Sequence, residues 1–213
     1  MTHKSKLIIL EGMECSGKST QINFLKEYFQ ASNQDFILVK EPGQTPLGQK
    51  LREILLFNNE PIDPLTQSFM FNACRSDIYE KIIIPNQNKD IFIIQDRAWT
   101  TTIVYQCFAF QQDLKRIEDA CHLAIHDIIP DLIIFLDIAM DKYMQVLDQR
   151  LTNRLNEKVN HFDKKDFSFY QRAYAGYQYL ANKFKDKWFN VDALQTPEEI
   201  HKQIVQEIEK RFN

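Results

Sequence analysis

The stretch Gly12-Met13-Glu14-Cys15-Ser16-Gly17-Lys18-Ser19 matches the pattern Gly-x-x-x-x-Gly-Lys-Ser/Thr at every fixed position. An apolar run at residues 6–11 precedes it, and a segment with helical periodicity follows at 19–32. Between a strand and a helix, such a loop turns its backbone N–H groups inward around a phosphate, which requires glycine at both ends. The stretch therefore predicts a binding site for the phosphates of a nucleoside triphosphate.

The polar residues of this loop each have an expected task. Lys18 brings a compact positive charge to the β and γ phosphates, and the hydroxyl of Ser19 is a ligand for Mg²⁺. The helix that follows adds the positive end of its dipole. We therefore expect nucleotide contacts from the whole loop, which comprises Gly12, Met13, Glu14, Cys15, Ser16, Gly17, Lys18, Ser19 and Thr20.

Composition excludes several other classes of protein. The chain has 213 residues, 44% hydrophobic and 26% charged, which is ordinary for a globular protein, and its net charge of −3 argues against binding to a nucleic acid polymer. Its four cysteines show no CxxC pair and no disulfide-like clustering, so we expect a reducing, cytoplasmic location. Its apolar runs are too short to span a membrane, and its first residues lack the apolar core of a signal peptide.

Short apolar runs alternate with helical segments along the chain. We expect strands at 6–11, 36–40, 91–95, 132–136 and 188–191, and helices at 19–32, 46–57, 63–86, 167–185 and 197–212. This alternation predicts one α/β domain over residues 1–213, with a five-stranded parallel sheet between helices on both faces in three layers. Because ligands of such sheets bind beyond the carboxyl ends of the strands, the residues just after each strand are the first candidates for a site.

Two polar segments directly follow predicted strands. Glu41-Pro42-Gly43 follows the strand at 36–40, and Asp96-Arg97 follows the strand at 91–95. The carboxylate of Asp96 suits Mg²⁺ or its waters, and the guanidinium of Arg97 suits a phosphate. Each segment also has a plain structural alternative, which is a strand-to-helix turn for the first and a helix cap with a surface arginine for the second.

Two pairs of residues are spaced to share a helix face. Phe71 and Arg75 lie four positions apart, which suits a flat base that stacks on the ring and accepts hydrogen bonds at a carbonyl edge. Thr101 and Tyr105 have the same spacing, and Gln106 follows them. The alternatives are a core phenylalanine with a solvated arginine, and a helix start with a core tyrosine.

A cluster of basic residues lies further along the chain. Arg150, Arg154 and Lys158 recur at intervals of four, which places like charges on one helix face. This indicates an anionic ligand and a lid, at about residues 150–166, that supplies an arginine to the transferred phosphate. The alternative is a solvated helix in which Glu157 pairs with Arg154.

Other sequence features and the length of the chain show which classes of phosphate-loop protein it can belong to. GTPases with this loop carry an Asn-Lys-x-Asp guanine-binding segment after a strand. Asn88-Lys89-Asp90 lacks that spacing and precedes a strand, so we exclude this class. A motor or a large ATPase needs a longer chain. A small kinase that transfers a phosphoryl group fits the length.

Together these segments resemble the thymidylate kinase family. The resemblance is carried by the phosphate loop and by Glu41-Pro42-Gly43-Gln44-Thr45-Pro46-Leu47-Gly48, Phe69-Met70-Phe71-Asn72-Ala73-Cys74-Arg75, Asp96-Arg97 with Tyr105-Gln106, and Pro130-Asp131-Leu132 leading to Asp137. It runs over nearly the whole chain in the family's order. It implies a P-loop kinase fold, ATP as donor with Mg²⁺, conversion of dTMP to dTDP for dTTP synthesis, and a homodimer.

The resemblance also implies roles for single residues. Glu14 corresponds to the acidic loop residue near the sugar and phosphate of dTMP, and Phe71 to the ring that stacks on thymine. Arg75 corresponds to the arginine at the thymine carbonyl, Thr101 to the hydroxyl near the base, and Tyr105 to the ring that crowds the sugar 2′ position. The implied sites are catalytic Lys18, Asp96, Arg97 and Arg154; ATP-binding Arg150 beside the loop; metal-binding Ser19 and Asp96; and substrate-binding Glu14, Glu41, Pro42, Phe71, Arg75, Arg97, Thr101, Tyr105 and Gln106.

Some positions depart from the family's pattern. Three single departures are Gln44, Ala98 and Tyr174. In addition, Asn160-His161-Phe162-Asp163 stands where many bacterial members read Asp-Arg-Ile-Glu, and Cys15 stands where some members carry a catalytic arginine. The remaining candidates for that arginine are Arg150 and Arg154.

Two other functions stay open on the sequence. One is a different deoxynucleotide or deoxynucleoside kinase with another choice of base. The other is a P-loop binding protein with weak catalysis, against which the presence of Lys18, Ser19, Asp96 and Arg97 argues.

Overall fold

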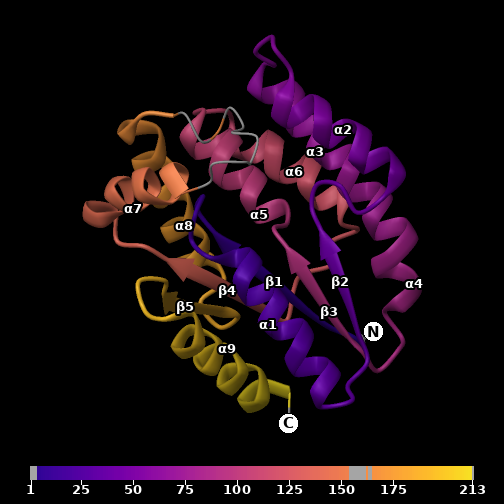
Figure 1. Ribbon diagram of the computed structural model, residues 1–213. Helices are drawn as coiled ribbons and strands as arrows, with labels where there is room; N and C mark the ends of the chain where they lie inside the picture. The colour runs from indigo at the N-terminus through magenta and orange to yellow at the C-terminus, as the bar shows by residue number, and fades with distance from the viewer. Residues whose placement is uncertain (1–3, 154–161, 163–164, 213) are drawn as a thin grey trace.

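A five-stranded sheet forms the centre of the molecule (Figure 1). The computed structural model describes residues 4–153, 162 and 165–212. The strands are β1 (Lys6–Gly12), β2 (Phe36–Lys40), β3 (Phe92–Asp96), β4 (Leu132–Asp137) and β5 (Trp188–Asp192). Their order is β2-β3-β1-β4-β5, and every neighbouring pair is parallel. The predicted α/β fold of the P-loop kinase type is thereby confirmed.

The central strand has an apolar centre, from Leu7 to Leu10, ahead of the phosphate loop. Ile8, Ile9 and Leu10 have no exposed surface. A strand flanked by two neighbours and covered on both faces has no solvated side, so its residues read as a continuous apolar run. The register pairs Leu10 with Asp96 of β3 and Gly12 with Leu136 of β4, so the carboxyl ends of these three strands meet at one edge.

Two groups of helices cover the sheet. α1 (Lys18–Ala31) and α9 (Pro197–Phe212) pack on each other and against β1, β3 and β5. The second group includes α2 (Pro46–Phe57), α3 (Pro64–Ile78) and α6 (Leu114–Ala124), which lie together at a distance from α9 in Figure 1. The remaining helices are α4 (Ile84–Asn86), α5 (Trp99–Thr102), α7 (Met140–Asn153) and α8 (Phe167–Lys183).

The helical stretch expected at 63–86 is continuous but not uniform. α3 is followed by a π-helical segment, η1 (Tyr79–Ile83), and then by α4, which contains Pro85. Proline has no N–H to donate and its ring collides with the carbonyl four residues earlier, so the preceding turn widens. Asp63 begins the stretch, and its carboxylate accepts hydrogen bonds from the first-turn backbone N–H groups of Leu65 and Thr66.

A second π-helical segment, η2 (Ile103–Ala109), follows α5. In it the N–H of Phe110 donates to the carbonyl of Tyr105, five residues earlier, at 2.8 Å. η2 packs along α8, where the side chain of Phe108 lies against Gly176. A Cβ on Gly176 would lie 3.0 Å from that ring, so any other residue would push the ring away by a few tenths of an ångström.

No bounds were predicted for α5, α6 and α7, although Thr101 and Arg150 were expected on helix faces. In α6 the buried residues are Ile117, Cys121 and Ala124, which follow helical spacing among many charged neighbours. In α7 the buried positions include Tyr143 and Leu147, again four apart. None of the helices in the part of the chain that the structure describes is long and apolar enough to cross a bilayer.

Candidate active site

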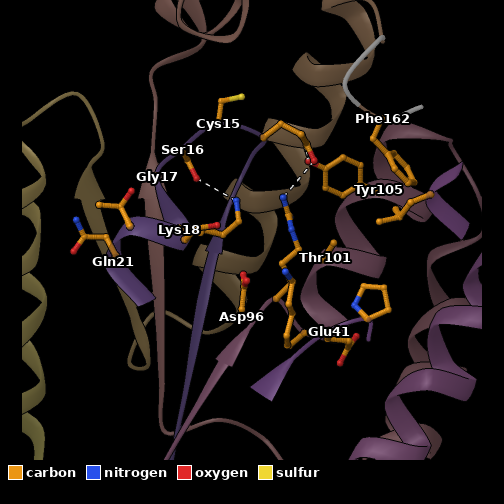
Figure 2. Close-up of a pocket in the computed structure, with 18 of the residues that line it drawn as sticks. Cys15, Ser16, Gly17, Lys18, Gln21, Glu41, Asp96, Thr101, Tyr105 and Phe162 are labelled. Carbon is orange, nitrogen blue, oxygen red and sulfur yellow. Dashed lines mark hydrogen bonds and ion pairs between the residues drawn. The ribbon is translucent and has the colours of Figure 1, made fainter. Parts of the chain in front are cut away.

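A cleft with a volume of about 770 Å³ opens at the carboxyl edge of the sheet. The phosphate loop lies in its middle, with α1 on one side and the residues after β2 and β3 on the other (Figure 2). Of the residues expected in a site, those that line it are Glu14, Cys15, Ser16, Gly17, Lys18, Ser19, Thr20, Glu41, Pro42, Phe71, Arg75, Asp96, Arg97, Thr101, Tyr105 and Gln106. The segments chosen because they follow strands therefore do come together.

The backbone of the phosphate loop requires glycine where the pattern has it. Gly12 has a φ of 155° and Gly17 a φ of 94°, and a Cβ on Gly12 would lie 2.4 Å from the Oγ of Ser16. Cys15 has a φ of 61°, a left-handed conformation that is uncommon for residues other than glycine. Gly12 and Met13 do not line the cleft themselves, but their carbonyls accept hydrogen bonds from Lys18, which does.

The ammonium of Lys18 is held inside the loop. Its Nζ donates to the carbonyls of Gly12 and Met13, both at 2.8 Å, and to the Oγ of Ser16 at 3.2 Å (Figure 2). Burial lowers the pKa of Lys18 to about 7, and the nearby charge of Arg97 adds to this effect. The lysine is therefore poised between its charged and neutral forms in the nucleotide-free protein.

Arg97 faces the phosphate loop from the end of β3. It has a φ of 62°, its Nη2 donates to the carboxylate of Glu14 at 3.3 Å, and its Nη1 donates to the hydroxyl of Thr101 at 3.4 Å. Tyr105 donates to the other oxygen of Glu14 at 2.5 Å. Burial alone would lower the pKa of Arg97, but Glu14 and the neighbouring phenols raise it well above its usual value. The guanidinium thus stays charged beside the loop.

Arg75 is fully buried and is tied to the residues that follow β2. Its Nη2 forms an ion pair with Glu41 and donates to the Oγ1 of Thr102 at 2.9 Å. Its Nη1 donates to Asn72, and a longer contact of 3.7 Å reaches the Sγ of Cys121. The alternative of a solvated arginine is therefore wrong, because the side chain is only 1% exposed. Phe71, on the same helix face, is also buried and lines the cleft.

The polar side chains near Tyr105 already have partners. The hydroxyl of Thr101 donates to both oxygens of Glu11, at 3.0 and 2.9 Å. The side-chain amide of Gln106 donates to Gln67 at 3.1 Å, and its own Oε1 is buried without a hydrogen-bond partner among the described residues. Thr101 therefore lines the cleft with its hydroxyl already bonded to Glu11, whereas Gln106 retains an unused acceptor.

Comparison with known proteins identifies the family. The family model described as thymidylate kinase matches residues 10–204. This chain belongs to the thymidylate kinase family. Similar proteins named thymidylate kinase come from Chlorobaculum parvum (30% identity over 202 residues, 93% of each chain) and Carboxydothermus hydrogenoformans (31% over 198 residues, 92% of this chain and 93% of the relative). A third, from Caldanaerobacter subterraneus subsp. tengcongensis, is 28% identical over 207 residues, which cover 97% of this chain and 96% of the relative.

The resemblance predicted from the motifs is confirmed, and the thymidylate kinase family comprises phosphotransferases, so the predicted enzyme class is confirmed as well. The departures can now be located in this thymidylate kinase fold. Gln44 accepts a hydrogen bond from the backbone N–H of Lys40 at 3.0 Å, which closes the turn after β2. Tyr174 donates to Asp137 at 3.4 Å, and burial raises the pKa of that carboxyl.

Several residues of this thymidylate kinase site were not anticipated from the sequence. Arg52 lines the cleft from α2, and its Nη1 donates to the carbonyl of Pro42 at 2.9 Å. Glu11 is completely buried and also accepts from Thr100 and Tyr177, the latter at 3.1 Å. Further lining residues are Gln21, Lys40, Leu56, Phe57, Ala98, Thr102, Phe162, Ala193, Gln195, Pro197 and Ile200. Those after β5 could have been found, because they follow a predicted strand.

The expected lid falls largely outside the described part of the chain. Arg154 lies outside it, and for Arg150 only the helical backbone at the end of α7 is described. Phe162 is described, and its buried ring meets the ring of Tyr105 edge-on at a centroid distance of 5.5 Å (Figure 2). One member of the segment that replaces Asp-Arg-Ile-Glu therefore covers the Tyr105 side of the cleft.

Proposed function

We propose that this protein transfers the γ-phosphoryl group of ATP to dTMP and releases ADP and dTDP. The observation that carries the proposal is the continuous cleft in which a phosphate loop lies next to a buried aromatic and guanidinium pair, Phe71 and Arg75. Membership of the thymidylate kinase family supports the same reaction. The charged groups between the two ends, Lys18 and Arg97, lie where the phosphates of donor and acceptor would meet.

The acceptor end suits a thymine base. The ring of Phe71 offers a stacking surface, and Arg75 offers only donors, which can satisfy a carbonyl but not an amino group. The Nε–H of Arg75 is buried without a partner among the described residues, and the contact to Cys121 is long, so donor capacity remains for a base carbonyl. The unused acceptor of Gln106 complements the ring N–H of thymine. Tyr105, fixed by Glu14, would crowd a sugar 2′-hydroxyl.

The transferred phosphoryl group would be stabilised by basic side chains that already face the cleft. The transition state spreads negative charge over the γ oxygens, and fixed cations around them lower the barrier. Lys18 and Arg97 are the described candidates, and Arg52 adds a third cation on the acceptor side of the cleft. Arg154 remains our proposal for the arginine of the lid.

A magnesium ion would fit at Ser19 and Asp96. Both residues line the cleft and provide oxygen ligands, which Mg²⁺ prefers. No cluster of three or more acidic, histidine or cysteine side chains occurs among the described residues, so the ion would take its other ligands from phosphates and water. When bound, Mg²⁺ would neutralise charge on the β and γ phosphates.

The assembly is proposed to be a homodimer. Phe69 on α3 is 58% exposed and Leu123 on α6 is 81% exposed, and the two helices pack side by side. Large apolar side chains on neighbouring helices are suited to burial against a second copy of the same surface. We also propose that residues 1–213 form a single kinase domain.

The test of the function is a steady-state assay of ADP release with ATP and a panel of acceptors. We expect kcat/KM to fall in the order dTMP, dUMP, then UMP and dCMP, with no turnover of thymidine. The methyl group of thymine contributes about 1 kcal/mol of burial, so dUMP should be a weak substrate. A cytosine amino group facing Arg75 would place donor against donor, at a cost of about 1–3 kcal/mol or more. Equal use of dCMP and dTMP, or turnover of nucleosides alone, would contradict the proposal.

A further inference from the structure

Gln21 is a buried polar residue that the proposed reaction does not use. It lies in the first turn of α1, three positions after Lys18, and its side chain is 1% exposed. An amide in such a position destabilises the fold unless it is hydrogen-bonded. The hydrogen bonds of this side chain therefore indicate its role in the protein.

The amide of Gln21 connects two segments that are distant in the sequence. Its Nε2 donates to the carbonyl of Pro197, the first residue of α9, at 2.9 Å. A backbone carbonyl only accepts, so the nitrogen must face Pro197 and the oxygen must face away. That Oε1 is buried without a hydrogen-bond partner among the described residues, so the bond to Pro197 is the only one recorded for this amide there.

Pro197 belongs to the wall of the cleft next to Gln21. The wall consists of Ala193, Gln195, Pro197 and Ile200, from the loop after β5 and the start of α9. Figure 2 shows Gln21 on the opposite side of Lys18 from Thr101, Tyr105 and Phe162. With dTMP at the Phe71 end and the triphosphate on the loop, the base of the donor nucleotide has this wall as its contact surface.

The wall is otherwise anchored to α9 and to the end of β4, where the N–H of Ala193 donates to the carbonyl of Asp137 at 2.8 Å. Gln203 donates to the Oε1 of Gln195 at 2.6 Å, and the N–H of Thr196 donates to Glu199 at 3.0 Å. These bonds hold the loop on its own helix and on β4, and α1 and α9 also meet further along their length, where Tyr28 donates to Glu209 at 3.0 Å, but none of these contacts joins Pro197 to α1. Gln21 provides a direct side-chain bond between the helix that follows the phosphate loop and the first residue of α9.

We propose that Gln21 is a positioning residue for the donor nucleotide: it sets the distance between the phosphate loop and the surface that receives the nucleobase. The inference rests on the proposed use of ATP. The phosphate loop can bind the triphosphate while the wall contacts the base only when the distance between loop and wall matches the length of the nucleotide. Loss of the hydrogen bond should reduce the part of the binding affinity that comes from the base and leave the part that comes from the phosphates unchanged.

The experiment compares two ligands that differ in the presence of a base. Calorimetry measures Kd for β,γ-imido-ATP and for inorganic tripolyphosphate, both with Mg²⁺, on the wild type, Gln21→Met and Gln21→Leu. We expect Kd for β,γ-imido-ATP to rise about tenfold in both variants, the size expected when one hydrogen bond is lost and a carbonyl is left unpaired. Kd for tripolyphosphate should stay within about twofold, because the loop and Lys18 are unchanged. Gln30→Met, on the exposed face of the same helix, is the control and should change neither value.

Two results would overturn the inference. One is an unchanged Kd for β,γ-imido-ATP in the folded Gln21 variants. The other is an equal rise for both ligands, which would mean that the phosphate loop itself is disturbed. Because both are binding measurements on the nucleotide alone, they are independent of dTMP turnover, and a wild type that binds ATP but does not phosphorylate dTMP would count against the proposed function only.

Discussion

The charge of Lys18 shows how a single residue depends on its loop. Its Nζ already has three acceptors in the nucleotide-free protein, but burial and Arg97 still lower its pKa to about 7. A phosphate placed beside the ammonium would favour the charged form and raise that pKa again. Nucleotide binding and protonation of Lys18 are therefore coupled.

We predict that binding of tripolyphosphate takes up a proton at pH 8 and that its affinity falls as the pH rises above about 7. The sign follows from the lowered pKa: above 7 the free protein has lost a proton that the complex must regain, whereas well below 7 Lys18 is already charged. Calorimetry at pH 8 in buffers with different heats of ionisation measures the uptake. The uptake should disappear in Lys18→Met, and a wild type that binds without proton uptake at pH 8 would refute the coupling.

Arg75 and Glu41 form a pair whose members need each other. Their side chains are 1% and 2% exposed, and the second oxygen of Glu41 accepts from Gln95 at 2.9 Å. Burial raises the pKa of Glu41, although Arg75 opposes the rise. Removing one partner leaves the other as an uncompensated buried charge or an unpaired buried acceptor.

We predict that Glu41→Gln destabilises the fold by about 3–5 kcal/mol, the usual effect of breaking a buried ion pair. Arg75→Met should also destabilise it, and the double variant should lose clearly less than the sum of the two. Urea unfolding of the four proteins measures the coupling free energy. Additive losses would mean that the pair does not act as a unit.

Spacing in the sequence predicted some of these residues but not all of them. Phe71 and Arg75 could be paired because four positions on a helix always share a face. Glu11 could not be paired with other residues in this way, because its partners Thr100 and Tyr177 are 89 and 166 residues away in the chain. Arg52 was missed for a related reason: its partner, the carbonyl of Pro42, lies ten positions earlier in a turn, and helical spacing does not relate the two.

At the scale of elements, the segment Glu41 to Gly48 combines two tasks. Glu41 and Pro42 face the cleft, while Thr45 caps α2, with its Oγ1 accepting from the N–H of Gly48 at 3.0 Å. A Cβ on Gly48 would lie 3.1 Å from that oxygen, so a larger residue would disturb the cap. The helix start thereby holds the turn that carries the site residues.

We predict that Thr45→Ala lowers the free energy of unfolding by about 1 kcal/mol, the typical value of an N-cap hydrogen bond. KM for dTMP should also rise, because the capped turn carries Glu41 and Pro42. Urea unfolding and steady-state kinetics check the two effects. Thr66→Ala, an exposed position in α3 whose side chain has no capping role, serves as the control and should change neither quantity by much.

The strands could be predicted to within one residue at each end, since continuous apolar runs have abrupt limits. Helices were harder. The amphipathic pattern of α6 is interrupted by charged residues, and the widened turn at η1 depends on Pro85 within an otherwise regular pattern. The exact limits and geometry of these helices depend on packing against neighbouring elements, and the local sequence pattern carries no information about that packing.

At the scale of the whole molecule, the parallel sheet gathers residues from four separate connections at one edge. The loops after β1, β2, β3 and β5 all contribute to the cleft. This part of the organisation was predictable, because alternating strands and helices dictate a parallel sheet and the edge at which its ligands bind. The lid expected at about residues 150–166 lies largely outside the described residues and stays a prediction.

We predict that Phe69→Asp and Leu123→Asp convert a dimer to a monomer, because each places a charge where an apolar side chain would be buried. Light scattering coupled to gel filtration measures the mass. Leu194→Asp, at an exposed apolar position away from α3 and α6, is the control and should leave the mass unchanged. A wild type that elutes as a monomer would contradict the proposed assembly.

The hydrogen bond from Phe110 to Tyr105 has a consequence for how related chains are compared. A turn closed over five residues contains one residue more than a regular α-helical turn, and each residue of an α-helix rotates the chain by about 100°. A relative in which this segment is a regular α-helix must therefore lack one residue between 103 and 109. If the two sequences are aligned without that gap, the correspondence shifts by one position, and the residue matched to Tyr105 is the one that belongs with Gln106. Alignments of this segment therefore have to be based on structure.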